Sequence, residues 1–309
     1  MRALSAWLAA LAMGPVFAQD PPPNVQTRQH GGNYVEPPAR VDSQYTPPGP
    51  DGRPTIPDQR PPLELQLAFD MPLRSGGTAN LGSGTQGSTA ASPTVQALLR
   101  WNPLRESWWF AQVIFYGDLR GDEQQAWHPD FSYAFGYDDW HPDTWHFFYG
   151  NYTGTRFQPG PGENRFNFPE GQWTAGYKFA LPRALEPWLL VGDGDRSICS
   201  ANAHLMPRYE DLASGTTRSG KKSLSLACRY ERPGGWFAQL AVYGYPERSQ
   251  QQPWDPDFTY GFGYDNWRPG TISVRYNNYS GNRFPGRERG PGEGTFRSGS
   301  VTVSWRVDW

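Results

Sequence analysis

Strict alternation of apolar and polar residues in the last ten residues, SVTVSWRVDW, constrains the possible fold more than any other feature. The apolar positions are Val301, Val303, Trp305, Val307 and Trp309. A period of two predicts a β-strand with one apolar face. In a water-soluble protein the uncovered edge of such a strand would promote aggregation. In a closed membrane barrel the same strand pairs with the first strand and turns its apolar face toward lipid.

This segment resembles the last strand of bacterial outer-membrane β-barrel proteins, which typically ends on an aromatic residue that the assembly machinery recognises. The resemblance covers about ten residues of the sequence. It implies that the barrel-assembly machinery is a partner and that Trp305, Val307 and Trp309 form the assembly signal. It also implies residence in the bacterial outer membrane, in contact with membrane lipid and lipopolysaccharide.

Composition agrees with a barrel and excludes other classes. The mean hydropathy of −0.71 argues against a helical membrane protein, and no stretch after the first residues approaches the ~18 apolar residues of a membrane helix. In a barrel only alternate residues face lipid, so low hydropathy is compatible with that fold. Aromatic residues make up 15% of the chain, which suits rings placed where lipid meets water. The net charge of −2 predicts no nucleic-acid partner.

The first 61 residues predict two segments outside the barrel. Residues 1–18 have a charged start at Arg2, an apolar run and a break at Gly14-Pro15, which predicts a signal peptide cleaved after Ala18. Residues 19–61 are polar and rich in proline, which predicts a disordered periplasmic tail. A spacer is the simpler interpretation of the tail, and a ligand for a periplasmic partner is the alternative.

An internal duplication organises the remaining sequence. Residues Trp127–Phe157 align without a gap to Trp254–Phe284, and 18 of the 31 positions are identical. The same offset of 127 places WFAQ at 109–112 onto WFAQ at 236–239. The pattern predicts two six-strand repeats, at about 62–180 and about 187–309.

Alternating segments predict six strands in each repeat. In the first they are Leu63–Met71, Val95–Trp101, Trp109–Gly117, Phe131–Asp139, Thr144–Tyr152 and Gln172–Ala180. In the second they are Pro187–Gly192, Ser223–Tyr230, Trp236–Gly244, Phe258–Asp265, Thr271–Tyr279 and Phe296–Trp309. Long connections, one of them 193–222, alternate with short turns, as in outer-membrane barrels. The predicted fold is all-β: a twelve-stranded antiparallel transmembrane β-barrel at 62–309.

The residues opposite the apolar set predict a polar lumen with charges of both signs. The lumen candidates are Arg100, Asp138, His146, Lys178, Arg229, Asp265, Arg275, Tyr152 and Tyr279. This lining predicts a narrow channel for small hydrophilic solutes such as oligosaccharides. Small barrels of the oligogalacturonate-porin type are similar in strand number, but their lumens are strongly basic, whereas this one is mixed. The alternative is a non-conducting barrel plugged by buried ion pairs, with a role in envelope assembly or interaction.

A second alternative is an outer-membrane lipid hydrolase, although no catalytic residues can be assigned. Such an enzyme needs a nucleophile with a base beside it, and His146 in a strand and His204 in the loop 193–222 are the histidines to consider. In the repeated segments, Arg156 and Arg283 leave strands at the outer side and are candidates for lipopolysaccharide phosphates. Cys199 in that loop and Cys228 on the lipid face leave pairing open. No cofactor or metal is predicted.

Overall fold

The computed structural model describes most of the predicted barrel. The described residues are 62–73, 78–80, 86–88, 93–104, 107–119, 129–139, 141–151, 155–158, 165–181, 195–211, 216–232, 234–252, 255–265, 270–278, 282–287 and 295–308. The predicted signal peptide, the predicted tail and the candidates Tyr152, Tyr279 and Trp309 lie outside these residues.

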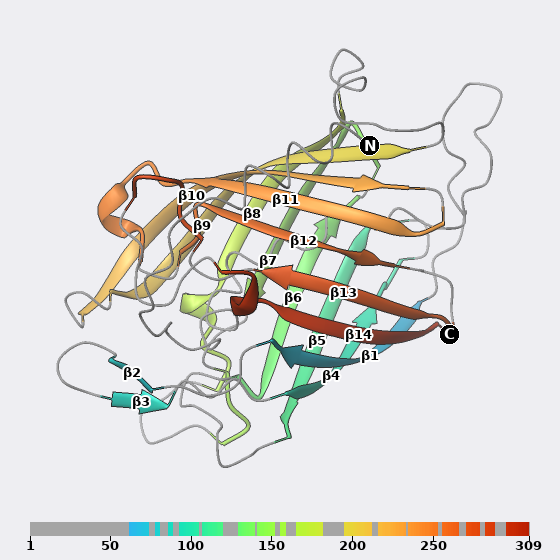
Figure 1. Ribbon diagram of the computed structural model, residues 1–309, viewed down its shortest axis with the longest axis horizontal. Coiled ribbons are helices and arrows are strands. Elements are labelled where there is room, and N and C mark those ends of the chain that lie inside the picture. The colour runs from blue at the N-terminus through green and yellow to red at the C-terminus, as the bar shows by residue number, and fades with distance from the viewer. Residues whose placement is uncertain are drawn as a thin grey trace.

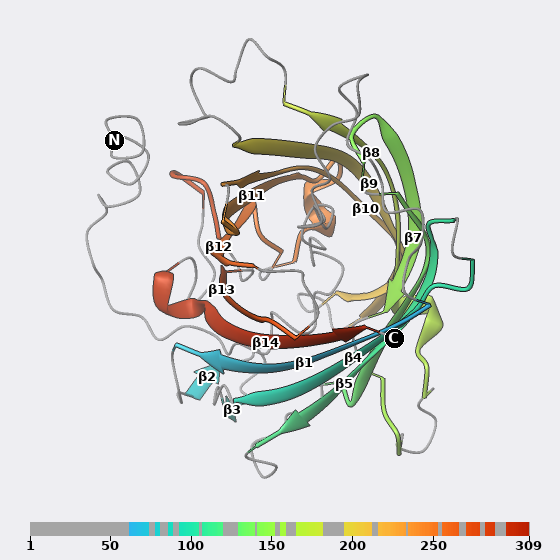
Figure 2. The same ribbon diagram turned by 90° about the vertical axis from the view of Figure 1, so that its right-hand side faces the viewer.

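Twelve antiparallel strands form one closed barrel (Figures 1 and 2). The strands are β1 (Leu63–Pro72), β4 (Thr94–Trp101), β5 (Trp109–Asp118), β6 (Phe131–Asp138), β7 (Thr144–Asn151), β8 (Gln172–Ala180), β9 (Arg196–Asp211), β10 (Thr216–Glu231), β11 (Trp236–Gly244), β12 (Phe258–Tyr264), β13 (Ile272–Asn278) and β14 (Ser300–Asp308). Each strand pairs with its neighbours in chain order, and β14 closes the barrel on β1 with Trp305 opposite Leu67. The predicted all-β fold, a closed antiparallel barrel of twelve strands, is confirmed.

Several short elements lie at the end of the barrel that carries the long connections, here called the long-loop end. They are the two-stranded sheet of β2 (Thr78–Asn80) and β3 (Gln86–Ser88) and the 3-10 helices η3 (Phe168–Glu170), η4 (Arg248–Gln250) and η5 (Phe296–Ser298). The opposite end, where β1 begins and β14 ends, is here called the short-turn end. The prediction that the last strand starts at Phe296 was wrong, because η5 occupies its first residues and β14 starts at Ser300.

The prediction of a long loop at 193–222 was also wrong. β9 and β10 extend through it as strands of 16 residues each, and their connection is only 212–215. The first strand of the second half is therefore β9, while the predicted strand Pro187–Gly192 lies outside the described residues. Small polar residues interrupt the alternation of apolar and polar residues in this stretch, so its sequence resembles that of a loop. The stretch still forms strands, because backbone hydrogen bonding between them does not depend on side-chain polarity.

A disulfide joins the two cysteines across this hairpin. Cys199 on β9 lies directly opposite Cys228 on β10, and their Cα atoms are 4.0 Å apart. Cys199 is thus in a strand, contrary to the prediction that placed it in a loop. The bond indicates an oxidising compartment, as expected for an exported chain.

Replacing Cys199 with serine should lower the free energy of unfolding by about 3 kcal/mol, because the cross-link closes a loop of 29 residues in the unfolded chain. Urea unfolding of the refolded barrel, with and without reductant, measures this. The reductant should shift the wild-type midpoint and leave the variant unchanged. Equal midpoints for the variant and the oxidised wild type would contradict the prediction.

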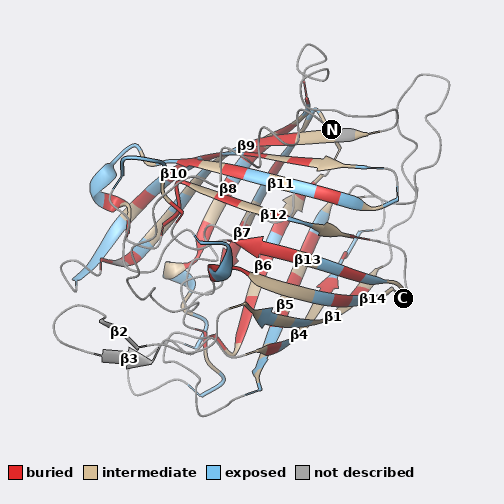
Figure 3. Ribbon diagram, in the orientation of Figure 1, coloured by how far each residue is buried: buried red, intermediate tan, exposed pale blue. Residues whose placement is uncertain are grey.

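Exposed and buried residues alternate along the strands (Figure 3). The exposed outer residues are mostly apolar and the buried inner ones mostly polar. On β10, for example, Leu224 and Leu226 are exposed, whereas Ser223 and Ser225, which alternate with them, are buried. Exposed tryptophans gather toward the short-turn end; they are Trp101, Trp109, Trp145, Trp236 and Trp305, and Trp145 is 70% exposed. A closed barrel with an apolar exterior and an aromatic girdle has the surface of an outer-membrane barrel.

Among the described residues, no helix has the length and apolar character needed to cross a membrane.

Candidate functional site: the barrel lumen

Charged side chains form a ring inside the barrel near its short-turn end. Each belongs to a residue within about three positions of that end of its strand. The members of this charge ring are Glu64, Arg100, Asp138, Lys178, Arg229, Glu231, Asp265 and Arg306. Five of them were predicted lumen candidates, and the fold brings them together from β1, β4, β6, β8, β10, β14 and the residue after β12.

Neighbouring members of the charge ring carry opposite charges and bind one another. The Lys178 ammonium donates to the Asp138 carboxylate. Arg229 donates to Glu231 at 2.5 Å and to Asp265 at 3.3 Å. On the other side of the ring, Arg306 lies 3.6 Å from Glu64, and Asn102 links Glu64 to Arg100 through bonds of 3.2 Å and 3.3 Å. With four acids and four bases, the ring has no net charge.

Two aromatic rings lie beneath the arginines. The Arg100 guanidinium carbon is 4.2 Å from the Phe110 ring centre, and that of Arg229 is 3.9 Å from the Phe237 ring centre. Both contacts are short enough for a cation–π interaction. Because the guanidinium groups lie over them, these phenylalanines do not offer open faces for a sugar to stack on.

The arginine side chains of the charge ring are largely withdrawn from water. Arg229 is 2% exposed, and even the most exposed of the ring arginines, Arg306, is 8% exposed. Charges removed from water this fully are tolerated only when they are paired. The ion pairs described above are therefore what allows these charges inside the barrel.

His146 and His204 point inward rather than toward lipid. His146 lies opposite Asp138 in the strand register, and its ring stacks at 5.9 Å on Phe148. His204 lies in β9, so the prediction of a loop position for it was wrong. Its Nε2 is 2.9 Å from Ser225 Oγ, and its Nδ1 is 2.9 Å from Gln172 and 3.0 Å from Thr174.

The sequence did not predict that Ser225 and His204 form a pair, because they belong to different strands and are 21 residues apart. A hydrolase needs its base oriented by a third group and its nucleophile open to the substrate. Here glutamine and threonine side chains surround the second ring nitrogen, and Ser225 is buried on the inner wall. The pair is therefore placed against the lumen and away from membrane lipid.

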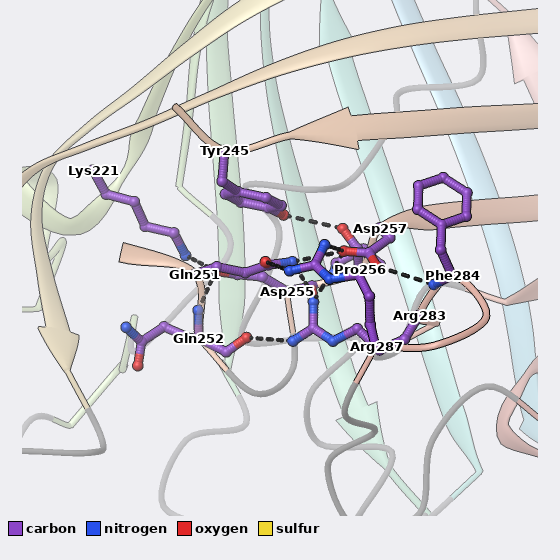
Figure 4. Close-up of polar contacts among 10 residues, drawn as sticks. All are labelled: Lys221, Tyr245, Gln251, Gln252, Asp255, Pro256, Asp257, Arg283, Phe284 and Arg287. Carbon is purple, nitrogen blue, oxygen red and sulfur yellow. Dashed lines mark hydrogen bonds and ion pairs between the residues drawn. The ribbon is translucent and has the colours of Figure 1, made fainter. Parts of the chain in front are cut away.

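At the long-loop end, the segment after β11 folds inward and is held by ion pairs (Figure 4). Lys221 reaches from the inner wall of β10 to Asp255, with 2.5 Å between Nζ and Oδ2. Asp257 accepts from Arg283 at 3.3 Å, from Arg287 at 2.5 Å and from the Phe284 backbone N–H at 3.0 Å. We call these residues, Lys221, Asp255, Asp257, Arg283 and Arg287, the loop clamp.

The loop clamp is built around buried carboxylates. The side chain of Asp257 is 0% exposed and that of Asp255 is 1% exposed. Arg283 also donates to the backbone carbonyls of Gln252 and Asp255. The clamp therefore ties the loops after β11 and β13 to each other and to the barrel wall. Of its residues only Arg283 was a candidate from the sequence, and for lipopolysaccharide contact; the pairing of Lys221 with Asp255 depends on how the loop folds back.

The remaining candidates are placed as follows. Arg156 binds Asp130 at 2.9 Å and Arg283 belongs to the loop clamp, so both have a partner within the protein, and lipopolysaccharide contact stays a prediction for them. Arg275 donates to Ser304 at 3.4 Å. Trp305 and Val307 lie on the outer face of β14, and their role in assembly stays a prediction. Among the described residues, no cluster of three or more His, Cys, Asp or Glu side chains could hold a metal ion.

Comparison with protein-family models finds no match to the sequence, and comparison with curated proteins finds none either. Among solved structures, the chain is similar to the NanC porin, with a TM-score of 0.39 and 9% identity over 80% of this chain and 99% of that chain. It is also similar to the COG4313 outer membrane channel from Pseudomonas putida F1, with a TM-score of 0.38 and 10% identity over 82% of this chain and 99% of that chain.

Proposed function

We propose that this outer-membrane barrel is a narrow channel for small hydrophilic solutes, such as oligosaccharides. The observation that carries the proposal is the inner wall, where polar and charged side chains predominate from the charge ring to the loop clamp, with a few apolar ones such as Phe110, Ile114 and Phe237 among them. A barrel that served only as a scaffold would be stable with an interior of well-packed apolar residues, since buried ion pairs contribute little net stability. A polar lining instead replaces the hydration shell of a passing solute.

Conductance of the refolded barrel in a planar bilayer tests this function. The wild type should give small, steady steps, because the charge ring narrows the lumen. Replacing both members of one pair, Arg229→Ala with Asp265→Ala, removes bulk and one charge of each sign from the ring, and should raise the conductance severalfold. Glu231 loses its bond to Arg229 in this variant. The lipid-facing variant Leu226→Ala is the control. A bilayer that stays sealed with both the wild type and the ring variant would overturn the proposal.

A non-conducting barrel is the second candidate, and the low exposure of the charge ring is the observation that favours it. In that case the interlocked ion pairs form a permanent plug, and the loops or the tail serve envelope assembly or interaction. The conductance experiment separates the two candidates. A lipid hydrolase has less support, because the His204–Ser225 pair faces the lumen.

We also propose that the barrel consists of two copies of one six-strand unit. Recurring contacts support this. Asp130 binds Arg156 and the Phe157 N–H, and 127 residues later Asp257 binds Arg283 and the Phe284 N–H. Tyr149 donates to the carbonyl of Phe168 and stacks on its ring at 4.4 Å, and Tyr276 does the same with Phe296 at 4.3 Å. In this arrangement the six barrel strands β1 and β4 to β8 correspond in order to the six strands β9 to β14.

A further inference from the structure

Uncharged polar side chains line the lumen between the charge ring and the loop clamp. They come from β1, β4, β9, β11 and β13. We call Gln66, Gln96, Asn202, Gln239 and Asn277 the amide belt. Two charged residues share this height, Asp70 and Arg275, which have opposite signs and hydrogen-bond to Thr302 and Ser304.

The amide belt is accessible from inside the barrel. Gln66, Gln96, Asn202 and Gln239 are half-buried, whereas the members of the charge ring other than Glu231 are buried. These side chains project to the inner face of a closed barrel, so their exposed area faces the lumen. A solute held between the two ends of the barrel would contact them.

Two belt residues have a buried carbonyl oxygen without a hydrogen-bond partner among the described residues, Asn202 Oδ1 and Gln239 Oε1. Gln239 donates from Nε2 to Asn277 Oδ1 at 3.5 Å. Because Oε1 is buried, a donor in the lumen reaches it only when the Gln239 amide turns and gives up this long contact. A buried acceptor without a partner is costly, and it is satisfied when a donor reaches it.

We propose that the amide belt is a binding site for uncharged, hydroxyl-rich solutes, and that it disfavours anionic ones. This inference rests on the proposed channel function. A sugar hydroxyl both donates and accepts, so it can satisfy Gln239 Oε1, whereas a carboxylate only accepts and cannot. The charge ring adds no attraction for anions because its charges cancel. Belt and ring together therefore favour neutral polyols over acidic sugars.

Current block in the planar bilayer tests this with two trisaccharides of similar size, maltotriose and trigalacturonate. Maltotriose should block the wild-type current at lower concentration than trigalacturonate. In Gln239→Met, which keeps the side-chain volume but removes the amide, maltotriose block should weaken about fivefold, as expected for the loss of one hydrogen bond. Trigalacturonate block should change less than maltotriose block, each block being measured relative to the open current of the same variant. Leu240→Met, on the lipid face of the same strand, is the matched control.

The outcomes separate this inference from the channel function itself. Stronger block by trigalacturonate, or equal maltotriose block in Gln239→Met and Leu240→Met, would overturn the binding site and leave the channel intact. If neither the wild type nor the ring variant Arg229→Ala with Asp265→Ala carries current, both the binding site and the channel function are overturned.

Discussion

Replacing Asp138 with alanine should destabilise the barrel by about 3–5 kcal/mol, the cost of leaving a buried charge without its partner. The side chain of Lys178 is only 5% exposed, and its ammonium is bound to Asp138. Without that carboxylate, the lysine must keep a charge in a site shielded from water or lose its proton. Urea unfolding of the refolded barrel in lipid vesicles measures the change in the free energy of unfolding.

The double variant Asp138→Leu with Lys178→Met is the control for this prediction. It removes both charges and fills the space with apolar side chains, so its stability should lie within about 1–2 kcal/mol of the wild type. The pair Arg229–Asp265 gives a second test in the other half of the barrel. A single-variant cost below about 1 kcal/mol, the value typical of exposed ion pairs, would mean that water reaches the charge ring.

Replacing Asp257 with asparagine should release the loop clamp while leaving the barrel folded. Arg283 has a side chain only 8% exposed, and it would lose its carboxylate partner. Removing one member of a buried pair costs about 3 kcal/mol, so hydrogen exchange in 245–257 and 282–287 should speed up by about a hundredfold. Mass-spectrometric hydrogen exchange resolves these loops from the strands.

Asp130→Asn, at the equivalent position of the first half, is the matched control for Asp257→Asn. Asp130 binds Arg156 and the Phe157 N–H, so its loss should loosen 155–158 and leave 282–287 protected. Unchanged exchange of 245–257 in Asp257→Asn would show that other contacts hold this loop.

Acid should reproduce the effect of Asp257→Asn in the wild-type protein. Burial alone would raise the pKa of Asp257, but the Phe284 N–H, the Gln251 amide and the guanidinium groups of Arg283 and Arg287 outweigh it and hold the pKa below its usual 3.8. A group with a lowered pKa stabilises the fold above its unfolded-state value and loses that contribution as the pH falls through the folded-state value. Loop exchange should therefore accelerate below about pH 3.8, and the asparagine variant should lack this step.

The sequence alone was sufficient to predict the barrel and much of its lumen. In β14 and β1 apolar side chains recur at every second position. Successive side chains of a strand point to opposite faces, so this pattern gives one apolar face, which a membrane barrel turns toward lipid. The same alternation places Asp138 and Arg229 on the inner wall, because once one face is assigned to lipid the other face must be the lumen. The similarity of 127–157 to 254–284 strengthened these predictions, since the strands in that segment were seen twice.

Only the tertiary structure decided which residues bind one another. Lys178 pairs with Asp138 at a separation of 40 residues, and Lys221 reaches Asp255 on a folded-back loop. Such pairings depend on strand register, barrel curvature and loop conformation, none of which a period of two specifies. The strand at 196–211 and the first part of the strand at 216–231, before the predicted Ser223–Tyr230, escaped prediction for a related reason. Their backbones pair with each other, and the hairpin needs no alternating apolar face to form.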